Sequence, residues 1–205
     1  EKIAVEARRQ EEGTAVKQVL AGLEETLGII AKDFEGLERR SSAEVGNLAG
    51  NLGSEARKYE ALAAALKNTT GDPEISGEME RVGNLLEDLK RRKTEADEVL
   101  DQVRKWEQRQ SDEEAAAGDL VRRGAEFLKG LQAAREKLDL NDSASCGEFL
   151  KGLKGARGEF ENELRLLKDT TGSPGVSESR RRMEGVLDGM SGIGKEVEGR
   201  LEELK

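Results

Sequence analysis

Few side chains in this sequence could carry out acid–base, nucleophilic or metal chemistry. The 205 residues include no histidine, and Cys146 is the single cysteine. Without histidine, Ser-His-Asp and Cys-His arrangements and most zinc sites are excluded, and one cysteine cannot form an internal disulfide. We therefore predict a protein that is not an enzyme, with no catalytic residue, no metal site and no cofactor.

One glycine-rich segment has the spacing of a phosphate-binding loop. Residues 189–195 read GMSGIGK, but Glu196 stands where such a loop needs serine or threonine. A phosphate loop also follows a strand, whereas this segment lies within an expected helix. We interpret it as helical and without a nucleotide.

The residue types best suited to protein binding are a basic cluster and the single tryptophan. Arg180, Arg181 and Arg182 are consecutive on an acidic chain, and they either pair with neighbouring glutamates on a solvated face or dock an acidic partner segment. Trp106 either packs at a domain boundary or, if exposed, is a candidate binding hot spot. We predict these four residues, with the stretch from Trp106 to Gly118, as the partner-binding site.

The composition favours long helices over a compact globule. Charged residues make up 38 % of the chain, apolar residues 35 % and aromatic residues 3 %. Narrow apolar seams on helices need only two or three positions in seven, so this composition can supply them. The net charge of −9 argues against nucleic acid or anionic lipid as a main partner. No run of about 18 apolar residues exists, so we predict no membrane insertion.

An internal repeat sets the expected architecture. Pro73 and Pro174 lie 101 positions apart, at the ends of the near-copies LKNTTGDP and LKDTTGSP. Three apolar runs in each copy follow heptad spacing, which predicts three packed helices. The runs are Val16, Leu20, Leu23, Leu27, Ile30, Phe34 and Leu37; then Val45, Leu48, Leu52, Tyr59, Leu62 and Leu66; then Ile75, Met79, Val82, Leu86, Leu89, Ala96, Leu100 and Val103. The same register predicts a packed, inert thiol at Cys146.

Helix boundaries are predicted from capping signals and from the repeated turn. Ser41 with Glu44, and Ser145 with Glu148, have the spacing of capping boxes that open the second helix of each copy. Each Thr-Thr-Gly-x-Pro segment ends that helix. Between the copies no proline stops the chain, so we expect one continuous helix with a bend near Gly118. The expected fold is all-α: two tandem three-helix coiled-coil bundles, residues 1–108 and 109–205, forming an elongated rod of roughly 100 Å.

Three heptad helices in about a hundred residues, in tandem, resemble spectrin repeats. The spacing of the apolar residues from Ile75 to Leu89 follows the family's third helix, although Leu86 and Leu187 stand where tryptophan is common. This departure indicates a divergent member of the superfamily. The turn from Asn68 to Pro73 is similar to turns of nesprins, the nuclear-envelope spectrin-repeat proteins.

The resemblance implies a non-enzymatic cytoskeletal linker or scaffold fragment. A nesprin-type protein would link the outer nuclear envelope to actin, and its repeats would act as a rod and as a docking site for a cytoskeletal regulator such as a formin. The expected location is then cytoplasmic and cytoskeletal. The implied partner is a formin or another actin-associated protein.

Two other functions stay open on the sequence. Asn68-Thr69-Thr70 and Asn141-Asp142-Ser143 are glycosylation acceptor patterns in expected loops, which would suit an extracellular helical-bundle surface or receptor protein. The chain could also be a passive mechanical spacer with no ligand of its own. Glycan on either asparagine would favour the first alternative, and absence of any partner the second.

Overall fold

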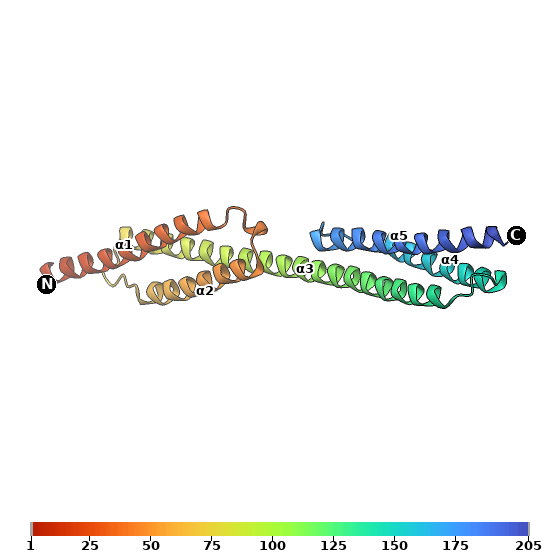
Figure 1. Ribbon diagram of the computed structural model, residues 1–205. Helices are drawn as coiled ribbons and strands as arrows, with labels where there is room; N and C mark the ends of the chain where they lie inside the picture. Colours follow the sequence, from red (N-terminus) through yellow and green to blue (C-terminus); the bar gives the residue numbers. More distant parts are fainter. Residues whose placement is uncertain (1, 205) are drawn as a thin grey trace. The chain divides into compact units, whose positions relative to one another are not determined.

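The structure is a computed structural model that describes residues 2–204. Each regular element in this range is helical, which confirms the all-α prediction (Figure 1). The elements are α1 (Lys2–Asp33), the 3-10 turn η1 (Leu37–Arg39), α2 (Ser42–Ala65), α3 (Pro73–Lys137), α4 (Ser143–Leu166) and α5 (Pro174–Glu203). None of the helices in the described range is long and apolar enough to cross a membrane.

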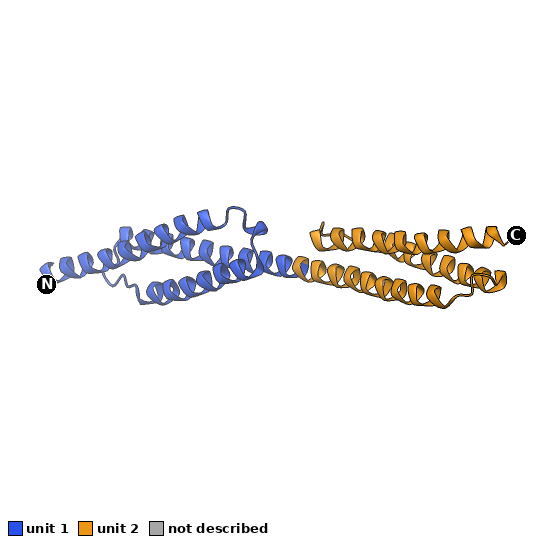
Figure 2. Cartoon of the chain, in the orientation of Figure 1, with its two compact units in different colours: residues 1–105 blue, residues 106–205 orange. Residues whose placement is uncertain are grey.

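The chain divides into two compact units, residues 1–105 and 106–205 (Figure 2). The division falls three residues before the boundary expected at 108. Helix α3 runs without interruption from Pro73 to Lys137 and supplies residues to both units. The expected continuity of the chain between Lys105 and Leu120 is therefore present as helix.

In unit 1, α1, α2 and the first part of α3 share one hydrophobic core. Most of the heptad residues predicted for it are buried or partly buried, and Leu23 and Leu89 have no exposed surface. Leu62 differs, because its side chain is 41 % exposed. Ala63 packs against the core instead, seven residues after the buried Ala56, because the helix period of 3.6 residues shifts the buried face away from a strict heptad.

In unit 2, the second part of α3 packs with α4 and α5 around two smaller core clusters. The larger contains Leu120, Leu131, Leu153, Met183, Leu187 and Met190. The other contains Cys146, Leu150 and Val197. Cys146 has no exposed surface, as the heptad register predicts.

The repeated turn adopts the same structure in both units. Helices α2 and α4 end at Ala65 and Leu166, and the next helices begin at Pro73 and Pro174. Gly71 and Gly172 have φ of 69° and 67°, a left-handed conformation that favours glycine. All of these equivalent positions differ by 101, so the offset seen in the sequence also relates the helix boundaries.

The two second helices begin with different capping residues. Ser41 and Glu44 form the predicted capping box at the start of α2. The box predicted for Ser145 and Glu148 is wrong. Helix α4 begins three residues earlier, because the Asp142 carboxylate accepts from the amides of Ala144 and Ser145. Asp142 is the residue 101 positions after Ser41, so the cap is in the repeat's register.

The corrected boundary predicts the effect of two substitutions. Asp142→Ala should lower the melting temperature of unit 2 by a few degrees, because two amides at the start of α4 lose their acceptor. Glu148→Gln should leave it unchanged, since Glu148 is exposed and six residues past the cap. Thermal unfolding followed by circular dichroism measures both. Equal destabilisation by the two variants would contradict the assigned cap.

Candidate functional site

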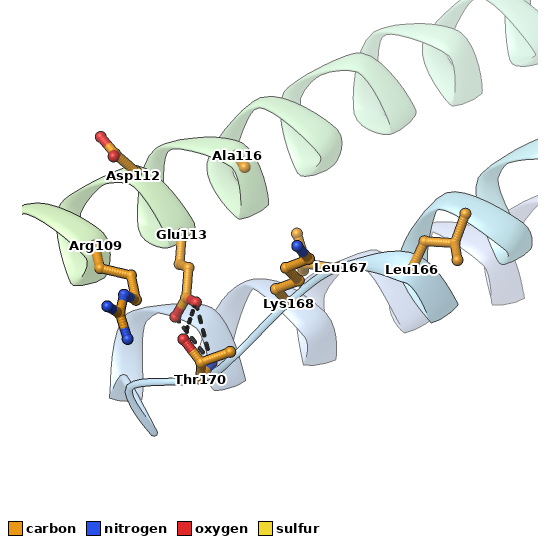
Figure 3. Close-up of a pocket in the computed structure, with 8 residues that line it drawn as sticks. All are labelled: Arg109, Asp112, Glu113, Ala116, Leu166, Leu167, Lys168 and Thr170. Atoms are coloured by element: carbon orange, nitrogen blue, oxygen red, sulfur yellow. Dashed lines mark hydrogen bonds between the residues drawn. The ribbon is translucent and has the colours of Figure 1, made fainter.

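A glutamate on the first helix of each unit holds the Thr-Thr turn in place. In unit 2, Glu113 on α3 extends toward the turn that follows α4 (Figure 3). Its carboxylate accepts from the Thr170 amide at 3.1 and 3.0 Å and from the Thr170 hydroxyl at 2.5 Å. The Thr171 amide and hydroxyl donate to it at 3.3 and 3.0 Å. One carboxylate thus satisfies four donors of a turn 57 residues away; we call this arrangement the loop clamp.

Unit 1 contains the same clamp at the same offset. Glu12 on α1 accepts from the Thr69 amide at 3.2 and 3.1 Å, from the Thr69 hydroxyl at 2.5 Å and from the Thr70 hydroxyl at 3.4 Å. Sequence reasoning missed both glutamates. The signal was present, because Glu12 and Glu113 are matched by the 101-residue offset, but among 43 acidic residues nothing singled them out.

The hydrogen bonds of the clamp shift the acidity of its carboxylates. The Thr170 hydroxyl lowers the pKa of Glu113 below its ordinary value, partial desolvation opposes this, and the Thr170 and Thr171 amides add to the lowering. The Thr69 hydroxyl has the same effect on the pKa of Glu12, again against desolvation. Both carboxylates are therefore held in the ionised form that accepts hydrogen bonds.

These shifts predict acid sensitivity. A folded-state pKa below the unfolded one gives stability that is complete above the unfolded pKa of about 4.3 and is lost as pH falls through the lowered value. The melting temperature should therefore fall more between about pH 5 and pH 3 for the unmodified chain than for Glu12→Gln/Glu113→Gln. Thermal melts across this range measure the difference. Parallel pH profiles would show that the clamp is absent.

The residue before each helix-opening proline gives the turn a second attachment, and its chemistry differs between the units. In unit 1, the buried Asp72 forms an ion pair with Arg9 on α1. In unit 2, the buried Ser173 donates its hydroxyl to Glu114 on α3. Each turn is thus tied to its first helix twice, and the second tie distinguishes one unit from the other.

A groove in unit 2 lies beside the loop clamp. Its volume is about 640 Å³, and it runs along residues 109–116 of α3 and along residues 166–170, from the last residue of α4 into the turn (Figure 3). Leu166 in its wall is 66 % exposed. The groove falls within the stretch from Trp106 to Gly118 that was expected to bind a partner, but none of the four predicted partner-binding residues lines it.

The structure gives those four residues different environments. Trp106 is 47 % exposed on α3. Arg180 is half-buried, and its guanidinium donates to the carbonyls of Leu164 and Leu167 at the end of α4. These hydrogen bonds indicate that Arg180 stabilises the end of α4 against α5. Arg181 and Arg182 are exposed and pair with Glu178 at 3.4 and 3.0 Å, which is the solvated-face interpretation.

The two glycosylation acceptor patterns differ in their surroundings. The Asn68 amide donates to the Asp72 carbonyl at 2.8 Å and to the Ser76 hydroxyl at 2.7 Å, and its oxygen accepts from the Asp72 amide at 2.9 Å. Glycan on that nitrogen would remove one of its two hydrogens and so break a hydrogen bond of the turn. Asn141 is exposed.

Other chemistry considered from the sequence finds no support in the fold. The segment 189–195 lies inside α5, so it offers no phosphate loop. Within residues 2–204, no group of three or more Cys, Asp or Glu side chains is placed to hold a metal ion. Comparisons with models of known protein families, with curated proteins and with solved structures found no match to this chain. The function is therefore argued from the chain's own residues.

Proposed function

We propose that this chain is a non-enzymatic segment of a cytoskeletal linker, built from two tandem spectrin-like three-helix repeats that serve as a rod and as a docking site for a cytoskeletal regulator. The observation that carries the proposal is the loop clamp, which occurs twice with its glutamates 101 residues apart. The repeated contact stabilises the turn between two helices of each unit. Such a contact suits a protein whose function is to transmit force along its length. Helix α3 supports this because it belongs to both units.

The resemblance to nesprins supplies the finer part of the proposal. In that case the parent chain would connect the outer nuclear envelope to actin, and the docked regulator would be a formin or another actin-associated protein. Trp106 is the residue we propose as the anchor, because an exposed tryptophan is costly in water and frequent among binding hot spots. Arg181 and Arg182 would contribute charge to an acidic segment of the partner.

The extracellular alternative is weakened by Asn68, whose amide is used inside the turn. The passive spacer is the outcome against which docking has to be tested. Both rivals make distinct predictions for the native protein, namely glycan in the first case and no specific partner in the second.

The test is affinity capture from a cytoskeletal lysate with residues 1–205 as bait. Recovery of an actin regulator with the unmodified chain, and its loss with Trp106→Ala, would support docking. Leu62→Ala is the matched control, since Leu62 is also a large exposed apolar residue at 41 % but lies in unit 1. Circular dichroism verifies that each bait is folded. No specific protein on a folded bait would contradict docking and favour the spacer.

A further inference from the structure

A second groove in unit 2 lies between α3 and α4 and has an apolar lining. Its volume is about 750 Å³. Leu131 and Leu153 line it and are buried, Phe149 is half-buried, and Phe127 is 36 % exposed. Gly152 and Gly155 line the α4 side. We call this the α3–α4 groove; Trp106 and the arginines 180–182 do not line it.

Four positions of the groove lining differ in chemistry between the units, whereas the positions of Leu131, Phe149 and Leu153 are apolar in both. The residues 101 positions before Phe127, Ala134, Gly152 and Ala156 are Thr26, Asp33, Asn51 and Glu55. All four equivalents in unit 1 are therefore polar or charged.

One side-chain pair shows the change directly. Thr26 and Tyr59 share a hydrogen bond of 3.1 Å in unit 1. At the equivalent place in unit 2, the rings of Phe127 and Phe160 contact each other with centroids 5.7 Å apart. Where unit 1 has a polar contact, unit 2 has an aromatic contact, and Phe127 is partly open to solvent. The aromatic pair is therefore a feature of unit 2 that unit 1 does not share.

The packing of unit 2 does not require glycine at positions 152 and 155. A Cβ atom added to Gly152 or Gly155 would meet no atom within 4 Å. Each glycine weakens the helix relative to alanine, and here nothing inside the unit compensates for it. Their absent side chains leave the α4 backbone accessible, which allows a second helix to approach closely.

Three charged side chains line the groove without an ion-pair partner among residues 2–204. Glu148, Lys151 and Glu159 make no ion pair with any residue of the described part of the chain. Their neighbours are paired: Lys154 with Glu198 at 2.6 Å, and Arg157 with Glu161 at 2.8 Å. Glu148 and Glu159 are eleven residues apart on α4, which corresponds to three turns and about 16 Å. They therefore lie on one face of the helix.

We propose that the α3–α4 groove binds an amphipathic helix of a partner protein. The apolar face of this helix packs on Phe127, Phe149 and the glycine surface of α4. Two basic side chains, eleven positions apart, pair with Glu148 and Glu159, and an acidic side chain pairs with Lys151. This is helix-in-groove recognition with charges that fix its direction. The inference does not depend on the cytoskeletal assignment, because it concerns only the partner's chemistry.

The test uses a displayed library of 18-residue helices with a fixed leucine and alanine face and randomised flanking positions. Selection on residues 1–205 should enrich Lys or Arg at two positions eleven apart. The enriched peptide should bind with a Kd of about 1–10 µM by fluorescence anisotropy, and Glu148→Gln/Glu159→Gln should weaken it and reduce its salt dependence.

Filling the groove provides the decisive comparison. Gly152→Leu/Gly155→Leu should weaken binding at least about tenfold and should keep the chain folded, since the added side chains enter open space. The matched control is Asn51→Leu/Ser54→Leu at the equivalent positions of unit 1, which should leave the Kd unchanged. Failure of the library to yield a saturable binder, or binders unaffected by the filled groove, would overturn the proposal. So would dimerisation of the chain that the filled groove abolishes, because the occupant would then be a second copy.

Discussion

Met183→Ala is expected to destabilise unit 2 by about 2–5 kcal/mol. The Met183 side chain has no exposed surface and belongs to the larger core cluster of the unit. It packs so closely against α3 that a Cβ on Gly124 would lie 2.7 Å from its sulfur. Truncation therefore removes many contacts at once and leaves a cavity that two helix backbones cannot easily close.

The expected loss is measured by urea unfolding followed by circular dichroism, with amide exchange to assign it to one unit. Leu166→Ala is the matched control, because Leu166 is 66 % exposed in the same unit and its truncation should have only a small effect. Protection of unit 1 amides should persist in Met183→Ala. A stability equal to that of the unmodified chain would contradict the packing of α5 against α3.

Glu113→Gln is expected to lower the melting temperature of unit 2 by about 5–10 °C. The glutamine oxygen can still accept a hydrogen bond from the turn. Its amide nitrogen, however, would face the backbone amides of Thr170 and Thr171, which can only donate, so these N–H groups would lose their acceptor. The substitution also removes the charge that strengthens the bonds of the clamp.

Asp112→Asn serves as the control, since Asp112 is the neighbouring residue and its contact with Gln108 survives the change. Thr170→Val removes the hydroxyl that donates to Glu113. In a double-mutant cycle, Glu113→Gln and Thr170→Val should be clearly non-additive, because each variant disrupts the same contact. Additive effects would mean that the two residues contribute independently and that no clamp forms in solution.

Most of the fold could be predicted because heptad seams leave a strong periodic signal. Residues such as Leu23, Leu52 and Leu89 recur at heptad positions and are buried. Leu62 was assigned to the core because it continues the heptad spacing from Leu48. The structure instead packs Ala63 against the core, because the helix period of 3.6 residues shifts the buried face away from a strict heptad.

The start of α4 was misplaced for a similar reason. Ser145 and Glu148 have the spacing of a capping box. Asp142 has no glutamate or glutamine three residues after it, so it does not show this pattern. A single carboxylate can nevertheless cap a helix by accepting from two amides, without a glutamate or glutamine side chain that bonds back to the capping residue. Comparison of the two copies at the 101-residue offset would have placed Asp142 opposite Ser41 and corrected the boundary.

The sites could be predicted less well than the fold. Arg180 was assigned to a binding cluster from its neighbours, but it donates to carbonyls at the end of α4 that only tertiary packing brings near. Glu12 and Glu113 were missed because their partners are 57 residues away, and periodicity carries no information on such contacts. The α3–α4 groove required both copies, since only their difference shows which surface is specialised.

We propose that the two units each bear mechanical force and unfold cooperatively. The most direct test is single-molecule force spectroscopy on residues 1–205 held at the two ends. We expect two unfolding steps, each releasing about 100 residues, or roughly 35 nm of contour length before the folded length is subtracted. Glu113→Gln should lower the force of one step and leave the other unchanged. A single step of twice the length, or gradual extension without steps, would contradict this proposal.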